Sequence, residues 1–266
     1  MGESIKRIVG PYQDSYSPNG IIGEKDACGV GFIANIKGIE SNWILKQSLK
    51  GLNCMEHRGG CGGDSDSGDG AGILCSIPWK YLDEKMNLKY EKDFNRGLGM
   101  IFMPNKKEKI EKCKSICDQE AEKLKIYSTS WRTVPVNNEI LGPLAKANAP
   151  FISQWILNID KKDNQDIERL LFQLRKRIEK KIRETLKNHV GDCEFYFASL
   201  SSQTVVYKGM VRSEILSEFY QDLKEDSFKV SFSVYHRRFS TNTLPKWPLA
   251  QPMRFLGHNG EINTLL

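Results

Sequence analysis

The sequence has no long apolar run. Its 266 residues contain no stretch near the ~18–20 consecutive apolar residues that cross a bilayer, so we expect no transmembrane segment and no membrane partner. The first 27 residues also lack the apolar core of a secretory signal and hold only short apolar pairs such as Ile8-Val9. The seven cysteines, an odd number without regular spacing, argue against a disulfide framework and favour a reducing, cytosol-like compartment.

The sequence also has little excess charge outside two stretches. The formal net charge of +6 divides into +5 over residues 161–187 (ten Lys/Arg against five Asp/Glu), +2 over residues 106–125 (seven against five) and −1 elsewhere. Apolar residues recur at helical spacing through 167–186, so the basic side chains are expected on the other faces of a helix. A nucleic-acid groove would need interleaved aromatic residues, which Phe172 alone does not supply. We therefore expect solvated helix faces and no nucleic-acid partner.

The pattern of the chain predicts strands and helices in alternation. Strands are expected at residues 28–36, 73–77, 98–103, 151–159, 194–200, 204–207 and 229–236. Helices are expected at residues 41–57, with Ser41 as the N-cap, and at 106–125, 161–187 and 211–223. Residues 201–203 predict a hairpin between two of these strands. Strands near both ends with helices between them favour layered sheets covered by helices.

Three patterns resemble ligand sites, but each has a plainer interpretation. The G-x-G at residues 29–31 lies inside a strand rather than before a helix, which argues against a dinucleotide fingerprint. The glycine-rich segment 57–72 lacks a P-loop lysine and predicts a loop with positive φ or close backbone approach. Cys54, His57 and Cys61 lack a fourth zinc ligand, which favours a packed thiol and a loop histidine.

Cys28 differs from the other cysteines because it opens an apolar strand directly after a polar leader and follows the small residue Ala27. Cleavage between these two residues would make Cys28 a new N-terminus. Its α-amine would then titrate near ~7.7–8.0, well below the ~10.4 of a lysine, and could act as a base beside the thiol. On local chemistry alone, an ordinary buried cysteine remains the alternative.

The last thirty residues contain two further groups of polar residues that follow strands. An arginine at a strand end, as in Arg237-Arg238, can hold a carboxylate through two hydrogen bonds. The side chain of Asn259 and the backbone N–H of Gly260 could form a two-donor oxyanion hole. Together with Cys28, these groups are typical of acyl transfer from the side-chain amide of an amino acid.

These motifs extend over nearly the whole chain after residue 25. They read DACGVGFIANIKG (26–38), MEHRGG (55–60), SGDGAGI (67–73), FYFASLSSQTVVYKGM (195–210), RRFSTNTLPKWPLAQP (237–252) and HNGEINTL (258–265). In this combination the chain resembles the class II glutamine amidotransferase domain found in the large subunit of glutamate synthases. The resemblance implies an α+β fold, a four-layer αββα sandwich of the N-terminal nucleophile hydrolase type, here C-terminally truncated.

The resemblance also implies a site that binds and hydrolyses L-glutamine. The implied catalytic residues are the nucleophile Cys28 and the oxyanion-hole residues Asn259 and Gly260. The implied substrate-binding residues are Arg238 for the α-carboxylate, Glu261 near the α-amino group, and Thr241 and Asn242 in the pocket wall. Arg237 is expected to point away from Arg238 on an extended strand and to have little effect.

The domain organisation follows from the same resemblance. Residues 1–27 are expected to be a propeptide-like leader, and residues 28–266 a glutamine amidotransferase domain that is incomplete at its C-terminus. Downstream synthase domains of the same polypeptide are expected to receive the ammonia, pass it to 2-oxoglutarate, and hold FMN and a 3Fe-4S iron–sulfur cluster. No cofactor or metal is expected in this chain.

Other parts of the interpretation stay open at the level of sequence. The electron donor of the longer enzyme is expected to be ferredoxin or a reductase subunit, and the location cytoplasmic, with a plastid location left open. One alternative is the glutaminase domain of another class II amidotransferase. A second is a non-catalytic fragment or binding module in which Cys28 is never unmasked.

Overall fold

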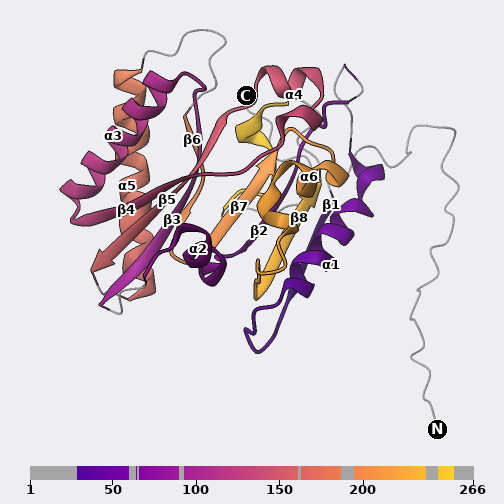
Figure 1. The fold of residues 1–266 in the computed structure, drawn as a ribbon, viewed down its shortest axis with the longest axis horizontal. Helices are drawn as coiled ribbons and strands as arrows, with labels where there is room; N and C mark the ends of the chain where they lie inside the picture. The colour runs from indigo at the N-terminus through magenta and orange to yellow at the C-terminus, as the bar shows by residue number, and fades with distance from the viewer. Residues whose placement is uncertain are drawn as a thin grey trace, which may run out of the picture.

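Two β-sheets lie face to face and helices cover their outer sides (Figure 1). The computed structural model describes residues 29–59, 64, 66–89, 93–160, 163–186, 195–237 and 245–254. The first sheet has the strand order β1-β8-β2-β7, with every neighbouring pair antiparallel. Its strands are β1 (Gly29–Ala34), β8 (Phe232–Arg237), β2 (Ala71–Ser76) and β7 (Thr204–Gly209).

The second sheet has the order β4-β5-β3-β6 and is also antiparallel throughout. Its strands are β4 (Ile126–Thr133), β5 (Phe151–Asp160), β3 (Phe94–Met103) and β6 (Tyr196–Ser201). The central strands β3 and β5 pair over ten residues each, and most of their side chains are buried. Consecutive positions are buried over residues 97–103 of β3 and 152–157 of β5, which shows that this sheet is covered on both faces.

Helices complete the outer layers. Helix α1 (Asn42–Asn53) packs on β1 and β8, while α3 (Lys107–Lys123) and α5 (Asn164–Thr185) pack on the second sheet (Figure 1). Three shorter helices complete the described set: α2 (Trp79–Met86), α4 (Pro143–Ala147) and α6 (Leu216–Phe219). The predicted four-layer αββα sandwich is therefore confirmed. In the described part of the chain, no helix is both long and apolar enough to cross a membrane.

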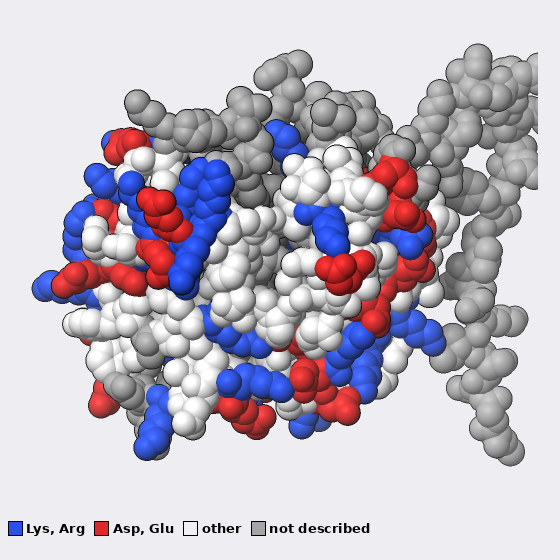
Figure 2. Space-filling view, turned by 45° about the horizontal axis from the view of Figure 1, so that its top comes forward, with Lys and Arg blue, Asp and Glu red and all other residues white. Residues whose placement is uncertain are grey.

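Helix α5 shows where the side chains of the more basic charged stretch lie. Its apolar stripe is buried, at Ile167, Leu171, Leu174, Ile178 and Ile182, and its basic residues occupy the remaining faces. In Figure 2 the Lys and Arg side chains on this part of the molecule are interspersed with Asp and Glu. The charge excess is thus a property of solvated helix faces, as predicted.

The prediction of a hairpin at residues 201–203 is wrong. The turn is present, with the Ser201 hydroxyl accepting from the backbone N–H groups of Gln203 and Thr204 at 3.1 and 3.2 Å. However, β6 pairs with β3 in the second sheet and β7 pairs with β2 in the first, so the chain crosses between sheets here. A local turn pattern cannot distinguish a hairpin from a crossing between sheets, because long-range packing determines which strands pair with those that flank the turn.

Other expected elements are confirmed with changed limits. The first helix begins after Ser41, but the Ser41 side chain makes no capping hydrogen bond. The helix ends at Asn53 rather than residue 57, and a 3₁₀ turn at Glu56–Arg58 follows. The helix expected at 211–223 is instead three short pieces, and β4 and α2 were not expected at all.

Helix α1 approaches the first sheet closely because of two glycines. A Cβ atom at Gly31 on β1 would collide with the ring of Tyr235, and a Cβ at Gly51 on α1 would lie 2.7 Å from its Oη. The Tyr235 ring is therefore held between the strand and the helix, with no room to move toward either. Gly31 thus serves close packing within the sheet rather than the binding of a dinucleotide.

We expect Gly51→Ala to destabilise the protein by about 1–3 kcal/mol, the usual cost of overpacking. At an exposed helical position the same change would stabilise by up to about 1 kcal/mol, because alanine favours the helix. Urea unfolding measures the difference. In a Tyr235→Ala background the penalty should disappear, and a penalty that persists there would show that the ring is not its cause.

Candidate active site

Three strands of the first sheet reach the same edge. The first residue of β1, Gly29, lies opposite the last residue of β8, Arg237, in the antiparallel register. The first residue of β2, Ala71, lies opposite Arg237 on its other side. The loops that precede Ala71 and follow α1 therefore arrive at this edge, together with the ends of β1 and β8.

The side chain of Arg237 is fully buried at this edge and contacts two separate segments, the turn at residues 56–59 and the loop at residues 69–70. Its Nη2 donates to Glu56 at 3.0 Å, and its Nη1 forms an ion pair with Asp69. Nη1 also donates to the backbone carbonyl of Gly70 at 3.0 Å. A Cβ atom at Gly59 would collide with the guanidinium, so the backbone at Gly59 lies directly against it.

Glu56 links this arginine to a third segment. Its Oε2 accepts the backbone N–H of Ser213 at 3.0 Å, in addition to the Arg237 Nε at 3.3 Å. Partial burial alone would raise the pKa of Glu56, but the hydrogen bonds and charge of Arg237, with the Ser213 contacts, outweigh it and hold the pKa below its usual value. Glu56 is therefore ionised at neutral pH and compensates part of the buried charge.

The described part of the glycine-rich segment makes close backbone approaches, as predicted. Gly70 has φ +142, and a Cβ at Gly68 would collide with the backbone of Val211 and Arg212. Asp64 fixes the same segment by accepting from the backbone N–H groups of Ser67 and Leu144, both at 2.8 Å. These hydrogen bonds lower the pKa of Asp64 to about 2, and the hydrogen bond from Leu144 has the largest effect.

All the residues that the sequence assigns to catalysis or substrate binding lie outside the described residues. They are Cys28, Asn259 and Gly260 for catalysis, and Arg238, Thr241, Asn242 and Glu261 for substrate. Two of them adjoin the edge in sequence, since residue 28 precedes Gly29 and residue 238 follows Arg237. Their roles accordingly stay predictions.

The sequence interpretation missed the group that holds this edge together. Arg237 was expected to have little effect, yet it is the buried centre of contacts with Glu56, Asp69 and Gly70. Because both Nη atoms of its guanidinium are paired with carboxylates of the protein, Arg237 is not available to bind the carboxylate of a ligand. The sequence offered one sign of this cluster: a basic residue, Arg237, in a strand, and acidic residues, Glu56 and Asp69, in two distant turns that contain glycine.

No metal centre is found within the residues that the structure covers. Cys54, one member of the Cys54-His57-Cys61 pattern, is exposed rather than packed as expected, and Cys61 lies outside the described residues. Cys75, Cys113 and Cys117 are buried free thiols whose pKa values are raised by burial. These thiols are unsuited to nucleophilic chemistry at neutral pH.

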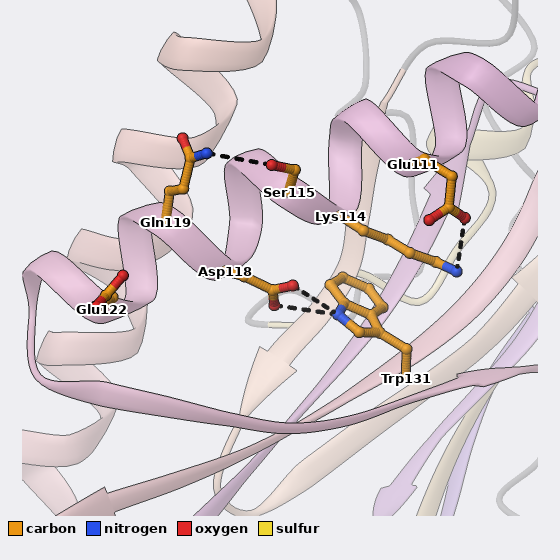
Figure 3. A pocket seen from close by; sticks show the side chains of 7 residues that line it. All are labelled: Glu111, Lys114, Ser115, Asp118, Gln119, Glu122 and Trp131. Carbon is orange, nitrogen blue, oxygen red and sulfur yellow. Dashed lines mark hydrogen bonds and ion pairs between the residues drawn. The ribbon is translucent and has the colours of Figure 1, made fainter.

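A cavity of about 460 Å³ lies elsewhere, between α3 and the Trp131 side chain of β4 (Figure 3). Trp131 donates to Asp118 at 3.1 Å on one side of it, and Lys114 reaches Glu111 at 3.4 Å on the other. Gln119 donates to Ser115 at 3.2 Å, so every lining residue except Glu122 is engaged with another one. None of the residues assigned to the candidate active site lines this cavity.

The chain matches the family described as class-II glutamine amidotransferases over residues 28–266. It is 48% identical over 259 residues to the ferredoxin-dependent glutamate synthase, chloroplastic, of Oryza sativa subsp. japonica, covering 96% of this chain and 16% of that protein. It is 47% identical over 250 residues to the ferredoxin-dependent glutamate synthase 2 of Synechocystis sp. (strain ATCC 27184 / PCC 6803 / Kazusa), covering 92% and 16%.

A third relative, the ferredoxin-dependent glutamate synthase of Pyropia yezoensis, is 45% identical over 269 residues, covering all of this chain and 17% of that protein. The chain thus spans 16–17% of the length of these curated relatives. The family resemblance read from the motifs is confirmed by these matches.

We expect Arg237→Met to destabilise the protein by about 3–5 kcal/mol, because it leaves Glu56 and Asp69 at the edge without their buried cation. The matched control is Lys46→Met, which removes the exposed pair between Lys46 and Asp226. Such exposed pairs are worth at most about 1 kcal/mol. Urea unfolding of both variants provides the comparison, and equal losses would show that the Arg237 cluster is no more important than a surface pair.

Proposed function

This chain belongs to the class-II glutamine amidotransferases, and we propose that it carries the glutaminase half of a glutamate synthase. In this proposal residues 1–27 are a leader whose removal exposes Cys28, and residues 28–266 belong to the amidotransferase domain. The substrate is L-glutamine, and the products are glutamate and ammonia. The family match, which begins at Cys28, supports this division.

The observation that carries the proposal is the strand register at the edge of the first sheet. Gly29 and Arg237 are directly opposed, and they are the sequence neighbours of Cys28 and Arg238. Consecutive Cα atoms are about 3.8 Å apart, so the proposed nucleophile and the proposed carboxylate clamp are each one such step along the chain from a member of this opposed pair. This supports a substrate bound across the ends of β1 and β8.

The proposed mechanism is acyl transfer through a thioester. The free α-amine of Cys28 takes the thiol proton, and the thiolate attacks the side-chain amide carbon of glutamine. The side chain of Asn259 and the N–H of Gly260 stabilise the oxyanion of the tetrahedral intermediate. As the carbon–nitrogen bond breaks, the α-amine returns its proton to the departing ammonia. Water then hydrolyses the thioester and releases glutamate.

Substrate orientation is proposed to depend on groups outside this covalent chemistry. Arg238 binds the α-carboxylate of glutamine through paired hydrogen bonds, and Glu261 contacts its α-amino group. Thr241 and Asn242 line the pocket wall. Arg237 contributes indirectly, because its ion pairs hold the turn at Glu56 and the loop at Asp69 against the end of β8.

The longer enzyme is proposed to use the ammonia on 2-oxoglutarate in downstream domains that hold FMN and a 3Fe-4S cluster. The assignment of both groups to these downstream domains rests on the family resemblance. Ferredoxin is the proposed electron donor, because the relatives are named for it.

The location is proposed from the same relatives. The relatives from Oryza sativa and Spinacia oleracea are named as chloroplastic proteins, whereas the names of those from Synechocystis and Pyropia yezoensis do not contain that word. A cytoplasmic location with a plastid alternative is consistent with both groups. Immunolocalisation against compartment markers distinguishes the two.

We expect Cys28→Ala to lower glutamine hydrolysis by at least about 10³-fold and to leave the leader attached, because both steps need the Cys28 thiol. Glutamate release and N-terminal sequencing of the full-length protein measure the two effects. The matched control is Cys54→Ala, which removes an exposed free thiol and should leave both unchanged. A wild-type protein that starts before Cys28 and is fully active would contradict the processed-nucleophile mechanism.

Replacing Arg238 with alanine should raise the KM for glutamine by about 10- to 100-fold with a smaller change in kcat, because a charge-assisted contact to substrate is lost. Arg238→Lys keeps the charge but not the paired geometry and should give an intermediate KM. Arg169→Ala, on the exposed face of α5, is the control. An unchanged KM in Arg238→Ala would remove this residue as the carboxylate clamp.

A further inference from the structure

Lys208 on β7 is a fully buried lysine. Its Nζ donates to the backbone carbonyl of Pro248 at 2.8 Å and to the Tyr196 hydroxyl at 3.1 Å, and it lies 3.4 Å from the sulfur of Met253. These groups come from three places: the opposite sheet and both ends of the segment 248–253. The amine therefore ties that segment to the interface between the sheets.

The partners of Lys208 are all neutral. No carboxylate pairs with its amine in the part of the chain that is described. The ionisable groups around it are Tyr196 on β6, Tyr220, whose hydroxyl donates to the Lys208 carbonyl at 2.7 Å, and the pair Arg175–Glu179 on α5. The pKa of Lys208 is lowered to about 7. Burial is the larger cause, and the positive charge of Arg175 adds to it.

The Arg254–Glu168 pair also lies next to this segment, since Arg254 follows Met253 in sequence. Glu168 on α5 is engaged elsewhere, because it accepts a hydrogen bond from the backbone N–H of Ser202 and forms an ion pair with Arg254. It is thus bound to other donors and does not serve as the counter-ion of Lys208. The cost of burying this amine is offset by its hydrogen bonds and by the Tyr196 ring, whose centroid lies 4.8 Å from Nζ.

The segment that Lys208 holds lies on strands of the candidate active site. A Cβ atom at Gly72, which pairs with Lys208 in the register, would lie 2.5 Å from the carbonyl oxygen of Gln251. Gly72 is the second residue of β2, one position from the edge where Arg237 is held. From Met253 the chain reaches Asn259 within six residues, at most about 20 Å of extended backbone.

We propose that Lys208 is a positioning residue for glutamine hydrolysis, which sets the path of the chain from Pro248 through Met253 toward the oxyanion-hole residues Asn259 and Gly260. The inference rests on the proposed function. Oxyanion-hole donors act only when they are aimed at the charge that develops in the transition state, and small displacements of such groups cost rate rather than substrate affinity.

The test replaces Lys208 with methionine, which has a similar length but donates no hydrogen bond. In the full-length protein, Lys208→Met should lower kcat for glutamine by about 10- to 100-fold while KM changes less than about twofold. Lys180→Met, an exposed lysine on α5, is the matched control and should match the wild type. An unchanged kcat in folded Lys208→Met protein would overturn the inference.

Hydrogen exchange provides a readout that does not depend on activity. Amides of residues 246–254 should exchange faster in Lys208→Met, whereas those of β5 should not change. Faster exchange in both regions, or in neither, would contradict a local anchoring role. The proposed function is tested separately, by the loss of glutamine hydrolysis in Cys28→Ala. A failure of the anchoring role of Lys208 can therefore be told from a failure of the proposed glutaminase function.

The pH dependence of stability identifies the amine itself. Because the pKa of Lys208 is lower in the folded protein than its usual 10.5, the folded state binds fewer protons than the unfolded state between pH 7 and 10.5. Wild-type stability should therefore rise with pH in that window relative to Lys208→Met, as measured by the urea midpoint. Parallel curves for the two proteins would refute a buried, titrating Lys208.

Discussion

The burial of the Arg237 guanidinium is the constraint on which the candidate active site depends. A buried cation is costly unless charges of opposite sign and further hydrogen bonds surround it. Here the compensating groups come from a turn after α1, through Glu56, and from the loop before β2, through Asp69 and Gly70. The cost of leaving the arginine unpaired therefore fixes both segments against the end of β8.

This constraint acts on a sheet edge whose geometry comes from close backbone packing. Gly59 lies directly against the guanidinium, and Gly31 and Gly51 let α1 approach β1 across the Tyr235 ring. The strand that begins at Gly29 is thus positioned from the helix side by packing and from the edge by ion pairs. Gly29, the sequence neighbour of the proposed nucleophile Cys28, is thus held in place from two sides.

The sequence could predict the features that depend on local pattern, and not those that depend on long-range pairing. The stripe of α5 was found from periodicity, the strand at β1 from its apolar and β-branched composition, and the family from its motifs. The separation of β6 from β7 into different sheets was not, because a turn pattern looks the same in a hairpin and in a crossing. Arg237 was misjudged because its carboxylate partners lie 168 and 181 residues away.

Two buried cations in this domain are compensated in different ways, and the difference indicates different roles. Arg237 keeps a permanent charge and faces two carboxylates, which is typical of a fixed structural joint. Lys208 faces a carbonyl, a hydroxyl and a sulfur, and burial brings its pKa to about 7. A cluster of matched charges resists change over the physiological pH range, whereas an amine held by neutral acceptors gains or loses a proton within it. The edge that carries the proposed nucleophile is thus held by the permanent charge, and the segment leading to the proposed oxyanion hole by the titratable one.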